Sequence, residues 1–229
     1  MAKENKEQKI INTLTSKSQL KQEVYDNTFS AFNLLKEVLK DMNQKYNDKL
    51  RESDHRIKLK YYENEEFEAE LKVAGDLLIF TMHSNVFQFN REHEIWKTKY
   101  VKDNVLAGFS GIISIYNFLS DSFKYGRNDD LGYLIARIFV NKDNFFFVQG
   151  KRQTGFNYSS LGTKKISKET LTKIVEAAIN YTLDFDLLVP PYDTVKLANV
   201  GQIRQSINDS KIRTGKRLGF QFRSDDIDK

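Results

Sequence analysis

The chain contains no cysteine, and among its 229 residues only two are proline and three are histidine. Without cysteine it cannot form disulfides, thiolate metal sites or a cysteine nucleophile. It also lacks any apolar run near the ~20 residues that a helix needs to cross a bilayer. The first residues are charged where a signal peptide would be apolar. These absences predict a soluble, cytoplasmic protein with no membrane partner.

Glycine and proline, the residues that break helices, are both absent from residues 1–74. Within Val24–Met42, apolar residues recur at alternating intervals of four and three, which is typical of an amphipathic helix. We expect this helix to begin near Lys6 or Ser18 and to end near Arg51, with an interruption near Thr13–Ser18, where clustered hydroxyl residues could cap a second start. So long a stripe exceeds what one small sheet can cover. It therefore predicts a homo-oligomer in which the helix contacts another copy.

Beyond the helix, apolar residues alternate with polar ones, which is the pattern of strands with one face on a core. Residues 57–61 and 67–73 predict a hairpin with its turn at Glu63–Glu66 and with lysines opposite glutamates. Residues 108–123 fit a helix and a strand equally. Further strands are predicted at Leu77–Met82, Val86–Phe89, Leu131–Val140, Phe145–Val148, Phe185–Val189 and Leu218–Phe222.

Helices are expected mainly at the two ends of the chain. Ser167 predicts the cap of a helix that ends near Leu183, and a short helix is expected around Val200–Ile207. Strand runs flanked by helices predict an α+β fold, with a largely antiparallel sheet and the C-terminal helix packed on it. We expect a helical segment over 1–53, an α+β domain over 54–223 and a disordered acidic tail over 224–229.

The two most β-prone runs, Leu131–Val140 and Phe145–Val148, are joined by the polar turn Asn141–Asn144. Both runs are apolar on both faces, which predicts strands in the middle of a sheet. Polar and basic residues follow the second run at once. The hairpin is therefore either a structural centre or a catalytic one.

The catalytic interpretation rests on three residues. Asp130 opens the first strand of this hairpin, and Gln149 and Lys151 end the second. The arrangement resembles the metal-binding hairpin of PD-(D/E)xK nucleases over residues 130–151. The resemblance implies Mg²⁺ held by Asp130 and the Gln149 oxygen, with Lys151 orienting water and Glu37 as a further acid. Gln149 departs from the usual glutamate, which weakens the affinity for metal.

The histidines offer a second arrangement for a metal. His83 and His93 flank the strand predicted at 86–89, and Glu92 and Glu94 lie beside the second of them. Two imidazoles and a carboxylate can bind zinc or iron when they meet. Because nothing in this spacing requires them to meet, we assign no metal site and expect ordinary polar contacts at strand ends.

Basic residues gather near the C-terminus. The chain carries 36 basic and 31 acidic residues, for a net charge of +5, yet Lys196–Arg223 contains a single acid, Asp209. This asymmetry predicts a polyanionic partner such as nucleic acid, with a solvated basic surface as the alternative. The candidate contacts are Arg204, Lys211, Arg213, Lys216 and Arg217.

Two classes of function follow. The favoured class is a non-catalytic binding or assembly protein, which oligomerises through its N-terminal helix, binds nucleic acid through the basic segment and needs no cofactor. The alternative is a Mg²⁺-dependent nuclease that uses the hairpin of residues 130–151. The long helix favours the first class.

Overall fold

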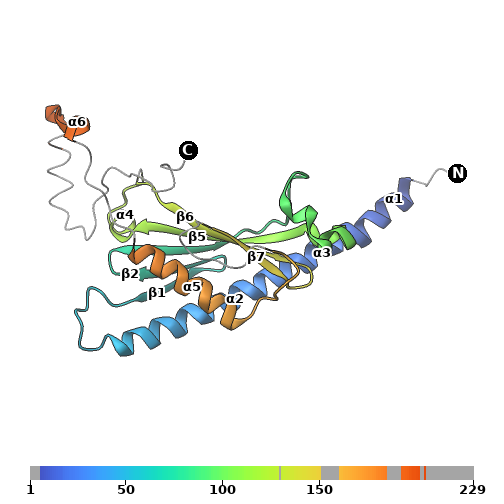
Figure 1. The fold of residues 1–229 in the computed structure, drawn as a ribbon, viewed down its shortest axis with the longest axis horizontal. Helices are drawn as coiled ribbons and strands as arrows, with labels where there is room; N and C mark the ends of the chain where they lie inside the picture. Colours follow the sequence, from blue (N-terminus) through green and yellow to red (C-terminus); the bar gives the residue numbers. More distant parts are fainter. Residues whose placement is uncertain (1–5, 129, 151–159, 185–191, 202–203, 205–229) are drawn as a thin grey trace.

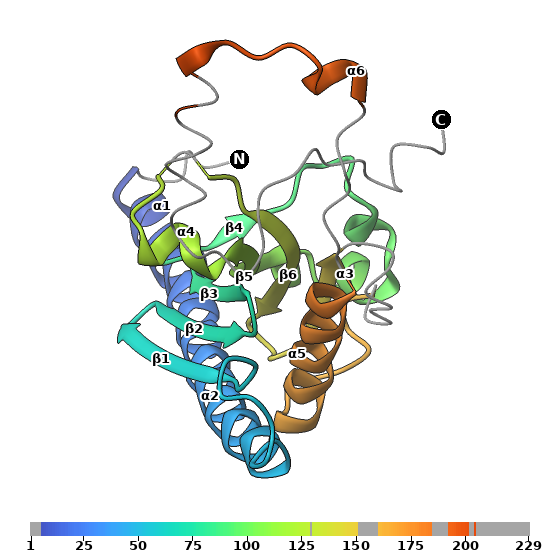
Figure 2. The ribbon, with the colours of Figure 1, turned by 90° about the vertical axis from the view of Figure 1, so that its left-hand side faces the viewer.

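An antiparallel sheet packs on two helices that cover the same face of it, α2 (Gln19–Lys49) and α5 (Lys168–Leu183) (Figure 1, Figure 2). The computed structural model describes residues 6–128, 130–150, 160–184, 192–201 and 204. The predicted α+β fold, with its N-terminal helix and its C-terminal helix on the sheet, is confirmed.

The N-terminal helical run has three parts: α1 (Lys6–Thr13), a π-helical turn (Leu14–Ser18) and α2. The expected second cap is wrong, because Ser18 has helical dihedral angles and makes no capping hydrogen bond. The hydroxyls of Thr13 and Thr15 instead donate to carbonyls four residues earlier, at 2.8 and 2.9 Å. Such bonds are compatible with a continuing helix and often bend it.

The apolar stripe of α2 is buried along its whole length. Leu35 and its neighbours pack against the inner face of the sheet and against α5. The expectation that this stripe needs a second copy is therefore wrong, since the same molecule covers it. Helix and sheet approach closely where a Cβ on Gly111 would lie 2.1 Å from Thr28 Oγ1. The buried stripe residues are Leu20, Val24, Thr28, Ala31, Phe32, Leu35, Val38, Leu39 and Met42.

The sheet has the strand order β1-β2-β3-β5-β6-β7, and β4 pairs with β5. Residues 108–123, which fitted helix and strand equally, form β5 followed by the short helix α4 (Ser120–Lys124). From Gly111 to Leu119 every second residue of β5 is buried and the residues between them are only partly buried, as expected of a strand with one face on the main core. The strands are β1 (Lys60–Glu65), β2 (Glu68–Val73), β3 (Asp76–Met82), β4 (Phe87–Gln88), β5 (Phe109–Leu119), β6 (Tyr133–Asn141) and β7 (Phe146–Gly150).

The predicted hairpin of β6 and β7 forms, but its place in the sheet differs from the prediction. Over the described residues, β6 is internal, whereas β7 is the last strand of the sheet. β7 is nevertheless apolar on both faces, because Phe147 stacks on Phe139 at 4.7 Å on the face away from α2. The two rings join a second small core with Ile95, Val101 and Leu161. Apolar residues on both faces therefore reflect two cores, not a central position.

The predicted charge pairing in the first hairpin is wrong. Lys60 lies opposite Lys72, and Tyr62 lies opposite Glu70. The pairing register shifts between Tyr62 and Glu65, so the alternation of the sequence does not carry through to the turn. The carboxylate of Glu63 instead reaches two lysines of α2.

The remaining elements are short, apart from α5. The Ser167 side chain accepts a hydrogen bond from the Thr170 N–H, as expected of the cap of α5. Predictions for 185–189, 218–222 and 224–229, and for most of 200–207, lie outside the described residues. In the part of the chain that the structure describes, no helix has the length and apolar character to span a bilayer. The short helices are η2 (Glu94–Lys97), α3 (Lys99–Asp103), η3 (Val105–Gly108) and α6 (Tyr192–Val195).

Candidate functional site

Asp130 lies in the turn that leads from α4 into β6. Its carboxylate accepts a hydrogen bond from Ser122 Oγ at 2.5 Å and forms an ion pair with Arg127 Nε at 2.8 Å. The Asp130 and Arg127 side chains are 17% and 21% exposed, so the pair is partly shielded from water. These contacts hold the turn closed and occupy the carboxylate that the nuclease interpretation assigns to a metal.

Gln149 lies near the end of β7, where its side-chain oxygen accepts a hydrogen bond from Arg137 at 2.5 Å. Gly150 pairs with Ala136, six residues after Asp130, and an extended chain of that length spans up to about 20 Å. The register therefore does not place Asp130 beside Gln149. Lys151 lies outside the described residues, so the nuclease interpretation stays a prediction.

Glu37, the further acid considered for the hairpin, is exposed on α2. It lies near Lys168 of α5, whose ammonium donates to Asp41 at 2.7 Å. That hydrogen bond, with a smaller contribution from Glu37, raises the pKa of Lys168. Glu37 thus contributes to the contact between α2 and α5.

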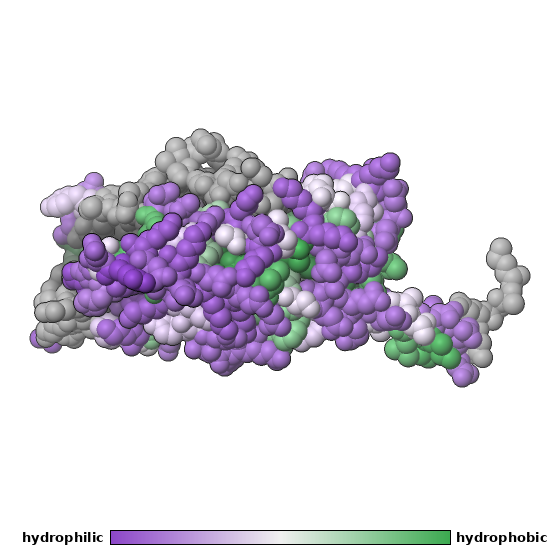
Figure 3. Space-filling model, turned by 90° about the horizontal axis from the view of Figure 1, so that it is seen from below, coloured by the Kyte–Doolittle hydropathy of each residue, from purple (hydrophilic) through white to green (hydrophobic). Residues whose placement is uncertain are grey.

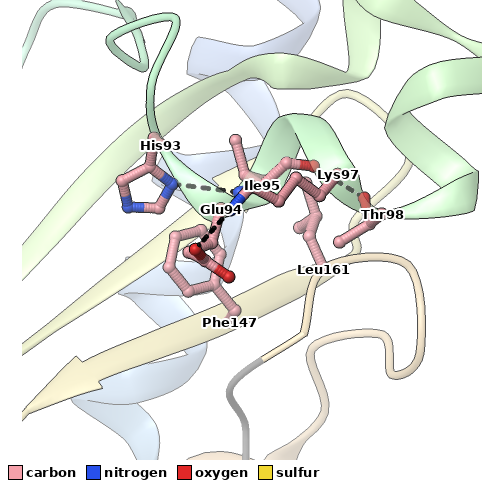
Figure 4. A pocket seen from close by; sticks show the side chains of 7 residues that line it. All are labelled: His93, Glu94, Ile95, Lys97, Thr98, Phe147 and Leu161. Atoms are coloured by element: carbon pink, nitrogen blue, oxygen red, sulfur yellow. Dashed lines mark hydrogen bonds and ion pairs between the residues drawn. The ribbon is translucent and has the colours of Figure 1, made fainter.

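His93 lines a small pocket of about 260 Å³ beside the second core (Figure 4). Its Nδ1 accepts a hydrogen bond from the Ile95 N–H at 3.2 Å, which caps η2, and its ring packs on Phe89. Glu94 pairs with Lys97 at 2.7 Å in the same view. His93 therefore makes a local capping contact.

His83 also makes a local contact, because its Nδ1 accepts the Asn85 N–H at 3.0 Å and its ring packs on Phe87. Across the described ranges, no group of three or more histidine, aspartate or glutamate side chains could hold a metal ion. The polar contacts at strand ends that we expected for His83 and His93 are the ones observed.

The basic segment falls largely outside the described residues. Arg204 is exposed, as a nucleic-acid contact would require. Lys211, Arg213, Lys216 and Arg217 lie in the part of the chain that is not described. Nucleic-acid binding therefore remains a prediction from charge alone.

The first feature that sequence reasoning did not single out is a bare helix end. α1 projects beyond the sheet (Figure 1), and none of its residues is buried. It nevertheless carries large apolar side chains, which we call the helix patch: Ile10 is 60% exposed, Ile11 45% and Leu14, in the π turn, 58%. Figure 3 shows a hydrophobic area, in green, near the free end of this helix. Exposed apolar side chains gathered in this way mark interaction surfaces.

The second unpredicted feature is an apolar groove at the opposite end of α2, with a volume of about 720 Å³. Its walls come from the end of α2, the loop into β1, the turn between β2 and β3, and the last turns of α5. Ile57 and Leu183 remain 45% and 53% exposed at this place. The residues that line this groove, which we call the end groove, are Tyr46, Lys49, Leu50, Ile57, Leu59, Val73, Ala74, Glu176, Ile179, Asn180 and Leu183.

The sequence contains a signal for the helix patch but none for the end groove. Ile10 and Leu14 are an apolar pair at helical spacing inside a polar segment, which is a detectable signal. The end groove has no such signal, because its walls come from separate segments that only the fold brings together. No protein-family model, no curated protein and no solved structure matches this chain.

Proposed function

We propose that this chain is a non-catalytic binding protein that self-associates through its N-terminal helix. The observation that carries the proposal is the helix patch on a helix that projects past its own sheet. Leaving three large aliphatic side chains in water forgoes the burial energy of each, about 1.5–3 kcal/mol for a fully buried residue. A second protein surface recovers that energy.

The hydrogen bonds of the candidate polar residues also support a non-catalytic binding protein. The carboxylate of Asp130 and the oxygen of Gln149 each have a partner from within the chain. His83 and His93 both use Nδ1 to accept a backbone N–H. These four side chains, which were considered as metal ligands, therefore make contacts of local structure.

The mass of the native chain in solution tests the proposal. We expect light scattering to give a mass above the 26.8 kDa of one chain, rising with concentration. Leu14→Asp should return the mass to one chain without changing the circular dichroism spectrum, because Leu14 lies in no core cluster of the described residues. A native chain that stays monomeric at every concentration overturns the proposal.

Nucleic acid is the partner that the charge pattern favours for the C-terminal segment. Each neutralised phosphate releases counterions, so the affinity should fall steeply with salt and depend little on base sequence. Replacing Lys216 and Arg217 by alanine should reduce the salt slope by about two. The absence of binding at low salt would remove nucleic acid from the proposal and leave self-association untouched.

A further inference from the structure

We infer that the helix patch of one copy docks into the end groove of a second copy, so that copies associate head to tail. This inference rests on the proposed function and names the partner surface that it requires. Both surfaces belong to the described part of the same chain, and each exposes apolar side chains to water.

A molecule cannot fill its own end groove. The helix patch precedes α2, and the groove is built at the last turn of that helix. With 31 residues at 1.5 Å each, α2 holds the two surfaces about 46 Å apart. Figure 1 shows α1 at one end of the molecule and the last turns of α2 and α5 at the other. The occupant therefore comes from another copy.

The helix patch and the end groove are both apolar. Ile10 and Leu14 are four residues apart, and Ile11 lies three before Leu14, so the three side chains share one side of a helical turn. An apolar helix side that enters an apolar groove is a common mode of recognition, read through anchors at this spacing. The groove offers apolar walls on three elements, with Leu50, Val73 and Ile179 among them.

The groove is also held in shape before any helix arrives. Tyr46 of α2 donates its hydroxyl to Glu176 of α5 at 3.0 Å, which ties the two walls together. A groove that is already formed loses less conformational freedom on binding, and this raises affinity. The same bond leaves the Glu176 carboxylate at the groove wall, where it can meet a basic helix.

Charge supports the pairing. Residues 6–18 carry Lys6, Lys9 and Lys17 against Glu7, a net charge of +2. The walls of the groove, residues 46–59, 73–75 and 176–184, carry five acids and four lysine or arginine residues, a net charge of −1, with Glu176 and Lys49 among the lining residues. Opposite charge guides encounter and orientation more than it adds affinity.

This contact is heterologous, because each copy contributes one helix patch and one end groove. Such contacts form rings when the rotation between copies closes and open chains when it does not. The mass in solution should therefore grow past a dimer as the concentration rises.

Sedimentation of single variants tests the inference. Leu14→Asp damages the helix patch and Leu183→Lys damages the end groove, and each should weaken self-association at least about tenfold. Tyr62→Lys is the control, since Tyr62 is 41% exposed on β1, beside Glu63, which pairs with Lys36 and Lys40 near the middle of α2 and so between the two surfaces, and should sediment like the native chain. Circular dichroism confirms that each variant is folded.

Mixing the Leu14→Asp and Leu183→Lys variants gives the decisive result. The Leu14→Asp copy keeps an intact groove and the Leu183→Lys copy an intact helix, so together they should form a one-to-one pair that grows no further. If the Leu14→Asp variant is monomeric while the Leu183→Lys variant still assembles, the helices pair with each other. The groove inference is then overturned, although the proposed function stands. If Leu183→Lys leaves assembly intact but abolishes binding of the apolar dye N-phenyl-1-naphthylamine, the groove is a small-molecule site. If neither variant changes the mass, both proposals fail.

Discussion

The two parts of the N-terminal helical run, α1 and α2, both carry apolar residues at helical spacing but have opposite surroundings. α2 buries a continuous apolar stripe, whereas α1 buries nothing and leaves the helix patch in water. The π turn between them holds one extra residue, which rotates the preceding side chains by about 100° relative to α2. Ile10 and Leu14 thus leave the line of the stripe. Amphipathic spacing shows that a helix has a partner, but not whether that partner is its own sheet or another molecule.

The largest expected effect is a loss of stability, which distinguishes the buried α2 from the exposed helix patch. Leu35 is fully buried in α2, so Leu35→Asp places a carboxylate in the core and should cost more than about 4 kcal/mol, enough to unfold the chain. Leu14→Asp, on the exposed part, should change the free energy of unfolding by less than about 0.5 kcal/mol. Urea denaturation measures both. A folded Leu35→Asp variant that differs only in mass would mean that the α2 stripe faces another copy.

A smaller effect tests how α2 holds the first hairpin. The Lys36 ammonium is buried, donates to the carbonyls of Glu65 and Glu66 at 3.1 and 2.9 Å, and pairs with Glu63 at 3.3 Å. Lys36→Ala should destabilise the fold by about 2–3 kcal/mol, because these acceptors lose a buried donor. Lys40→Ala is the matched control, since Lys40 also pairs with Glu63 but is 55% exposed, and should cost less than about 1 kcal/mol. Equal losses would show that Lys36 acts through surface charge alone.

The Glu63 carboxylate predicts that the stability of the fold depends on pH. The hydrogen bond from Lys40, followed by that from Lys36, lowers the pKa of Glu63 from 4.5 to about 2. The unfolded chain therefore binds more protons in this interval, so the stabilisation is complete above pH 4.5 and is lost as the pH falls toward 2. Because the side chain is 38% exposed, screening limits the loss to about 1 kcal/mol. The urea midpoints of the native chain and Glu63→Gln should converge on acidification, and a constant difference would contradict the prediction.

The smallest effect concerns the end of the second hairpin. If this region is not catalytic, Lys151→Ala removes one charge and should change the free energy of unfolding by less than about 0.5 kcal/mol. If the nuclease alternative holds, the same variant loses Mg²⁺- or Mn²⁺-dependent cleavage of DNA while staying folded. A native chain that degrades DNA with Mg²⁺, beside an inactive Lys151→Ala variant, would reinstate the alternative.

Local patterns predicted most elements of the fold. Alternation identified β2, the apolar run after the turn at Gly75 identified β3, and the Ser167 hydroxyl identified the start of α5, because these signals lie within a few neighbouring residues. The register of β1 could not be predicted, since it depends on a shift after Tyr62 that the sequence does not mark. The position of β7 as the last strand of the described sheet was missed because a second core covers its outer face.

Less of the candidate site than of the fold could be predicted from the sequence. The Ile10 and Leu14 spacing was visible, but its exposure depends on where the sheet ends and on the π turn. The end groove joins Leu50, Val73 and Ile179, which lie far apart in the chain. Only tertiary packing brings such residues together, so no local pattern carries the information.

The outer edge of β1 has a consequence for how the protein behaves at high concentration. Among the residues that the structure describes, β1 pairs only with β2, so its other side presents backbone N–H and C=O groups that a foreign strand could join. Five of its six residues are exposed, and Glu63 and Glu65 would face like charges if the strands of two molecules met there. Lysine, glutamate and asparagine along this edge oppose fibril growth. We therefore expect concentrated solutions to stay free of β-rich aggregates.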